Sequence, residues 1–108
     1  MVSFEDFKKI NIRVGKILSA EKVPETDRLL KLEVNFSEEN PRTIVSGIAE
    51  HFSEEKDLIG KKVAFVTNLE PRKIRGVESN GMILAVSDNE NFSLLEVDNK
   101  IPAGSIVG

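Results

Sequence analysis

The sequence contains no cysteine, so disulfides, thiolate metal sites and thiol nucleophiles are excluded. It also lacks tryptophan and tyrosine, which leaves few aromatic platforms on which single-stranded bases could stack. No apolar run approaches the ~20 residues that would span a bilayer. Residues 1–9 carry acidic side chains where a signal peptide needs an apolar stretch, so we expect a cytoplasmic protein with no membrane partner.

A chain of 108 residues fits one domain with a single core. Its composition, 40% hydrophobic and 31% charged, is typical of a folded globular protein. The net charge is -3, but the cations are unevenly distributed. They form two basic clusters, which are Lys8, Lys9, Arg13 and Lys16, and then Lys61, Lys62, Arg72, Lys73 and Arg75. If the clusters meet in the fold, the protein has a cationic face suited to a polyanion.

Residues for catalysis are scarce. His51 is the only histidine, and the spacing G-x-x-S-x-G over 76–81 departs from the G-x-S-x-G of a nucleophile elbow. Neither a P-loop nor a dinucleotide fingerprint is present. The acids at positions 54, 55 and 57 suit the first turn of a helix better than a metal site. We therefore expect a binding protein rather than an enzyme, with no cofactor and no metal.

Hydrophobic alternation and turn residues predict an all-β chain with short helices. We expect helices at 4–9, capped by Ser3, and at 53–60, capped by Ser53. The strands are expected at 10–23, 30–36, 42–49, 62–69 and 82–87, with a sixth at 93–97. Gly15 is interpreted as a bulge or bend. This pattern favours a five-stranded OB-fold barrel over about 10–87 with a C-terminal extension over about 88–108; a five-stranded sandwich is the alternative.

The stretch NLEPRKIRGVESNGM, at 68–82, gathers Arg72, Lys73 and Arg75 among turn-forming residues. An electropositive loop after a barrel strand attracts phosphates, and Asn68, Ser79 and Asn80 add uncharged hydrogen-bonding groups. Glycines in the stretch allow a backbone to approach a ligand closely. The alternative is a solvated loop whose charges only aid solubility.

The same stretch, as N-L-x-P-R-K-I-R-G-x-x-S-x-G-M, resembles the tRNA-binding domain family. Members of that family are attached to methionyl-tRNA synthetases or occur as stand-alone structure-specific tRNA-binding proteins. Three more motifs also resemble it, namely DFKKINIRVGKI at 6–17, P-x-x-D-R-L-L-K-L at 24–32 and R-T-I-V-S-G-I-A at 42–49. The similarity covers nearly the whole chain, and four ordered motifs are much more specific than any one of them.

The resemblance implies an OB-fold barrel, covering residues 1–108 as one domain, that dimerises through elements outside the barrel, including its C-terminal extension. It also implies recognition of folded tRNA by shape, without catalysis. The residues in tRNA-contact positions by resemblance are Asn68, Arg72, Lys73, Ser79 and Met82. On charge alone we add Lys31, Arg42 and Arg75. From the residues alone, Met82 at the start of an apolar strand is more typical of a core position.

Two further expectations concern partners. The tail holds six apolar residues, more than it should leave in water, which are Leu94, Leu95, Val97, Ile101, Ile106 and Val107. They fit a homodimer interface, although packing against the chain's own barrel is the alternative. We expect the protein to be the beta subunit, or a trans-acting tRNA-binding module, of a methionyl-tRNA synthetase. The alternatives are a chaperone-like, protein-binding dimer related to protein export, and a scaffold that docks onto the synthetase.

Overall fold

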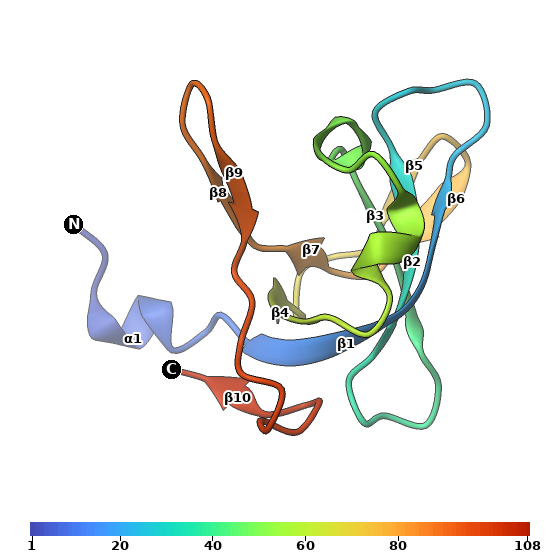
Figure 1. Ribbon diagram of the computed structural model, residues 1–108. Coiled ribbons are helices and arrows are strands. Elements are labelled where there is room, and N and C mark those ends of the chain that lie inside the picture. Colours follow the sequence, from blue (N-terminus) through green and yellow to red (C-terminus); the bar gives the residue numbers. More distant parts are fainter.

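A nearly closed antiparallel barrel of five strands forms the body of the molecule in the computed structural model, which describes residues 1–108 (Figure 1). The strands run in the order β3-β2-β1-β4-β7. They span β1 Ile12–Lys22, β2 Leu30–Asn35, β3 Arg42–Ser46, β4 Lys62–Val66 and β7 Met82–Ile83. The predicted all-β chain with short helices and a five-stranded barrel is therefore confirmed.

The core comes from the alternation in the sequence. In β2, Leu30, Leu32 and Val34 face inward and are fully buried, whereas the residues between them are half-buried. Phe36 and Phe65 meet edge to face in the core, with ring centroids 5.3 Å apart. Burying each such side chain contributes about 1.5–3 kcal/mol, which offsets part of the conformational entropy that the chain loses when it closes into the barrel.

Gly15 does not form the predicted bulge. It pairs regularly with Val63, and the irregularity in β1 lies further along the strand, between Ile17 and Ser19. The glycine is needed for space, because a Cβ there would lie 2.5 Å from Val34 Cγ1 and 2.6 Å from Phe36 Cε1. Such distances are shorter than any van der Waals contact, so the absent side chain makes room for the aromatic core.

The two predicted helices differ in outcome. The first is present as α1, Phe4–Phe7, and the Ser3 hydroxyl accepts a hydrogen bond from the Asp6 amide at 3.1 Å. The second is a short 3₁₀ turn, η2 Glu55–Leu58, without a side-chain cap from Ser53, and it follows another 3₁₀ turn, η1 Ala49–His51. Leu58 at the end of η2 is buried in the core, and without a capping side chain the segment forms the tighter 3₁₀ turn in place of the predicted α-helix.

The predicted strand at 82–87 is split. After β7 the chain leaves the barrel at Leu84, and β8 Ala85–Ser87 pairs with β9 Phe92–Leu94 in a projecting hairpin (Figure 1). The sixth strand, expected at 93–97, is thus β9, shifted toward the N-terminus. Leu94 packs in the barrel core, so the expected boundary between barrel and extension near residue 88 falls inside this hairpin.

The C-terminal tail returns to the barrel. Its strand β10, Ile106–Val107, pairs with the start of β1 at Ile12 and Arg13. The Lys62 ammonium donates to the carbonyls of Asn99 and Ile101 at 2.8 and 2.7 Å, which ties the preceding turn to β4. Consequently α1 and β10 lie near each other at one end of the molecule (Figure 1). No helix is long and apolar enough to cross a membrane.

Candidate nucleic-acid interface

The basic stretch folds as a β-hairpin rather than the loop expected from the sequence. Strand β5, Arg72–Ile74, pairs with β6, Val77–Ser79, and we call residues 72–79 the basic hairpin. Its two-residue turn has φ of 52° at Arg75 and 80° at Gly76, the pattern of a type I′ turn. A left-handed backbone conformation destabilises a residue other than glycine by about 1–2 kcal/mol. Arg75 is exposed at the tip of the turn, so packing of its side chain does not compensate for this strain.

The hairpin cations are free. Arg72, Lys73 and Arg75 are exposed, and none of them forms an ion pair. Most other cations of the two basic clusters are already paired with acids, as in Lys8–Glu5, Lys9–Asp6, Arg13–Glu38 and Lys61–Glu96. The strand register places Lys16 of the first cluster opposite Lys62 of the second. Within the two basic clusters, the cations that have neither an ion-pair partner nor a carbonyl acceptor are therefore Lys16 and the three of the basic hairpin, where Glu78 lies opposite Lys73 in the strand register.

Ser79 closes the barrel. It is buried, and its hydroxyl accepts a hydrogen bond from the Val45 amide at 2.9 Å while it donates weakly to the Gly81 carbonyl at 3.4 Å. The next residue, Asn80, donates its backbone N–H to the Thr43 carbonyl at 2.8 Å. These bonds join the end of β6 to β3. The hydroxyl of Ser79 accepts from the Val45 amide, a role that a backbone carbonyl of a neighbouring strand has in a regular sheet.

Three other predicted site residues lie at separate places, and only Met82 among them adjoins the hairpin. The Asn68 side chain donates to the Lys9 carbonyl at 2.6 Å and accepts from the Asn11 amide at 2.8 Å, which fixes the chain before β1. Met82 is 47% exposed and lines a small depression with Arg72 at the hairpin base. The exposed position of Met82 removes the core alternative. Lys31 lies on the outer face of β2, 3.7 Å from Glu21.

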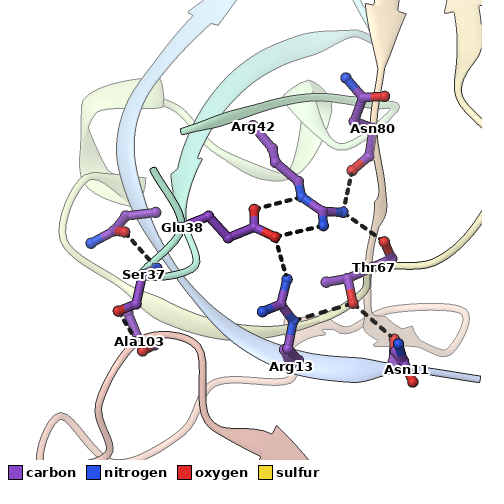
Figure 2. Close-up of polar contacts among 9 residues, drawn as sticks. Asn11, Arg13, Ser37, Glu38, Arg42, Thr67, Asn80 and Ala103 are labelled. Atoms are coloured by element: carbon purple, nitrogen blue, oxygen red, sulfur yellow. Dashed lines mark hydrogen bonds and ion pairs between the residues drawn. The ribbon is translucent and has the colours of Figure 1, made fainter. Parts of the chain in front are cut away.

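Arg42 belongs to an ionic cluster that we call the arginine clamp, made of Arg13, Glu38 and Arg42 (Figure 2). The Nε and Nη2 atoms of Arg42 donate to the two Glu38 oxygens at 2.8 Å each, and Arg13 Nη2 donates to the same carboxylate at 2.8 Å. Arg42 Nη1 also donates to the carbonyls of Thr67 at 2.6 Å and Asn80 at 3.4 Å. The clamp thus ties β1, β3 and the segments flanking the basic hairpin.

The electrostatics of the clamp follow from this geometry. The hydrogen bond from Arg42 lowers the pKa of Glu38 from 4.5 to about 2; burial opposes the shift, and Arg13 adds to it. The same carboxylate raises the pKa of Arg42. Both guanidinium carbons lie 5.4 Å from the centre of the Phe36 ring, so the clamp covers one end of the core. Arg42 is held by internal partners, unlike the hairpin cations.

An apolar groove of about 480 Å³ lies between α1, the start of β1 and β10. Phe4, Phe7 and Ile10 line it from one side, and Ile106 and Val107 from the other. All five are exposed, and Ile106 is 83% exposed. Of the tail residues expected to be apolar surface, Leu94 packs on the barrel, whereas Ile106 and Val107 open onto this groove.

Residues 12–106 match the family model described as "Putative tRNA binding domain". This chain belongs to the tRNA-binding domain family. A methionine–tRNA ligase of Methanospirillum hungatei is 51% identical over 104 residues, which are 96% of this chain and 15% of that protein. The chain therefore spans only a small part of the length of such relatives.

Solved structures agree with the family assignment. A MetRS related protein from Pyrococcus horikoshii superposes with a TM-score of 0.92 at 38% identity, covering 100% of this chain and 98% of that chain. The chaperone CsaA from Bacillus anthracis has a TM-score of 0.86 at 28% identity, covering 100% of this chain and 99% of the other. The resemblance inferred from the sequence motifs is confirmed.

Proposed function

We propose that this domain binds folded tRNA through the basic hairpin and acts, without catalysis of its own, together with a methionyl-tRNA synthetase catalytic chain. The observation that carries the proposal is the set of three unpaired cations on one projecting hairpin of a chain with net charge -3. Family membership and the named synthetase relatives support the choice of tRNA as the polyanion.

Binding begins with electrostatic capture. Each phosphate that a hairpin cation neutralises releases condensed counterions, so affinity falls steeply with salt. The hairpin is rigid because its base is fixed to β3 by Ser79 and Asn80. A rigid group of cations binds best to phosphates that are held at fixed positions, as in a folded RNA. A chain without Trp or Tyr has few side chains on which the bases of a flexible single strand could stack. Both features favour a folded RNA over an unfolded one.

The predicted site residues take two roles in this proposal. Arg72, Lys73 and Arg75 contact phosphates, and Met82 contacts a ribose or base beside them. Ser79, Asn68 and Arg42 hold the interface in place, because their polar groups already have internal partners. Lys31 stays a predicted contact, and its ammonium would leave its ion pair with Glu21 to bind a phosphate.

We also propose a homodimer through the groove between α1 and β10. Strand β10 pairs with β1 alone, so its other edge is open, and the surrounding apolar side chains are exposed. A symmetric dimer would cover both features and present two basic hairpins to one tRNA, which raises affinity through effective concentration. The likeness to a structure named chaperone does not favour protein binding, since the groove a client would need is the one this dimer covers.

The test compares two triple variants with the same net charge. Arg72→Gln/Lys73→Gln/Arg75→Gln removes the hairpin cations, and Lys22→Gln/Lys56→Gln/Lys100→Gln removes three exposed lysines that form no ion pair elsewhere. Filter binding of folded tRNA over a salt series gives affinity and slope. We expect only the hairpin variant to bind more weakly and to lower the slope, by about 0.9 for each phosphate that is no longer neutralised. Equal weakening in both variants would reject the hairpin as the binding site.

A further inference from the structure

A recess of about 420 Å³ opens at the base of the basic hairpin. Its lining residues are Pro41, Arg42, Thr43, Leu69, Pro71 and Asn80. Pro71 directly precedes β5 and Asn80 directly follows β6, so the two ends of the hairpin form part of its wall. The start of β3 and the residue before it form the opposite side.

The walls of the recess are rigid and partly apolar. Pro41 and Pro71 have fixed φ angles and compact rings, and Leu69 is 48% exposed beside them. These side chains offer C–H faces against which a planar ring can pack. Because the proline side chains lose little conformational freedom when a ring binds, the entropy cost of binding at this recess is small.

Asn80 brings an unused hydrogen-bonding group to the recess. Its backbone is fully occupied, since the N–H donates to the Thr43 carbonyl and the carbonyl accepts from Arg42. Its side-chain amide forms no hydrogen bond within the chain and points away from the clamp in Figure 2. A carboxamide places one donor next to one acceptor, the pattern that pairs with the N6 and N7 atoms of adenine.

The arginine clamp keeps this arrangement in place. Glu38 holds the Arg42 guanidinium, which in turn binds the carbonyls of Thr67 and Asn80 on either side of the hairpin. The guanidinium therefore cannot swing out to fill the recess without breaking four hydrogen bonds. A site that is open and held before its ligand arrives is the preorganised kind that binds tightly.

We propose that this recess seats one unpaired nucleobase of the bound RNA and that the Asn80 amide reads the edge of that base. The inference rests on the proposed function, because the basic hairpin supplies the charge complementarity that brings RNA here. Arg72 directly follows Pro71 of the recess wall, so an RNA backbone held by Arg72 lies beside the recess. A peptide side chain, the other class of occupant, would leave these cations without partners.

Diethyl pyrocarbonate footprinting of bound tRNA tests the seat, because it modifies unpaired adenines at N7, one of the two atoms that the Asn80 amide would cover. The variants are Asn80→Ala and Asn80→Leu; the second keeps the size of the side chain and removes only its polarity. Asn89→Ala, an exposed amide in the loop between β8 and β9, is the matched control. Affinity over a salt series is measured in parallel.

We expect the unmodified protein to protect one unpaired nucleotide and both Asn80 variants to leave that nucleotide reactive. Their affinity should fall about fivefold or more, the discrimination of a two-bond amide–base pair. The salt slope should not change, because the hairpin cations still neutralise the same phosphates. If either variant melts at a lower temperature, Leu69→Ala tests the wall of the recess instead, since that side chain is 48% exposed.

Two results are distinguished. Normal tRNA binding without a protected unpaired nucleotide, or protection that survives in the Asn80 variants, would overturn the nucleobase seat and leave the proposed function standing. Failure of the unmodified protein to bind tRNA would overturn both.

Discussion

Glu38→Gln removes the charge at the centre of the arginine clamp while it keeps the size of the side chain. In the folded protein this carboxylate accepts three hydrogen bonds of 2.8 Å from Arg13 and Arg42. Glutamine can accept on one atom only, and its amide would face guanidinium groups that also donate. The two arginines would then be without the anion that separates their charges.

The magnitude follows from the pKa of Glu38, which falls from 4.5 to about 2 on folding. A shift of this size corresponds to about 3 kcal/mol of unfolding free energy. Because the side chain is 33% exposed, solvent screening reduces the contribution to about 1–2 kcal/mol. The lowered pKa means that this stability is fully present above pH 4.5 and is lost as the pH falls toward about 2.

Urea unfolding followed by far-ultraviolet circular dichroism is the assay, since the chain has no tryptophan or tyrosine to report fluorescence. We expect Glu38→Gln to lower the unfolding free energy at pH 7 by about 1–2 kcal/mol and to lie close to the unmodified protein near pH 2. Glu39→Gln, the neighbouring acid without an ion-pair partner, should change it by less than about 0.5 kcal/mol. An equal gap at both pH values would refute the electrostatic account of the clamp.

Four further outcomes are expected. Gly15→Ala should lower the unfolding free energy by about 1–3 kcal/mol through overpacking, and Gly47→Ala, with open space at its Cβ, should not; equal urea curves would contradict the packing argument. Ser79→Ala should cost about 1–3 kcal/mol in thermal unfolding because a buried N–H is left without its acceptor, and an unchanged midpoint would disprove its role in closing the barrel. Arg75→Asn should raise the melting temperature by relieving the left-handed turn and yet weaken tRNA binding; weaker folding would contradict the turn assignment. Ile106→Asp should shift sedimentation velocity toward the monomer, and an unchanged dimer would exclude the groove as the interface.

Local patterns predicted much of the fold. Alternation in β2 identified its buried face, and Ser3 identified the start of α1, because both signals act within a few residues. The strands of the basic hairpin have three residues each, too short for alternation to be recognised in a sequence. Gly15 was misread because a close approach by side chains 19 and 21 positions away has the same sequence appearance as a bulge.

The sequence located the candidate site, but it did not distinguish the residues free to bind a ligand from those that hold the fold in place. Motif and charge both pointed to residues 68–82, where the free cations lie. They could not separate Arg42 from Arg72, because the partners that occupy Arg42 include carbonyls 25 and 38 residues away. Glu38 lies only four residues before Arg42, but the sequence does not show that the two side chains pair, because Glu39 and Glu70 are acids equally near to other cations.

Amide chemical-shift mapping on the ¹⁵N-labelled chain, titrated with folded tRNA, tests the central claim most directly. The account predicts that the largest shifts fall in the basic hairpin and at residues 41–43 and 80, while the hairpin formed by β8 and β9 stays unchanged. Shifts confined to α1 and β10, or spread evenly over the surface, would contradict it.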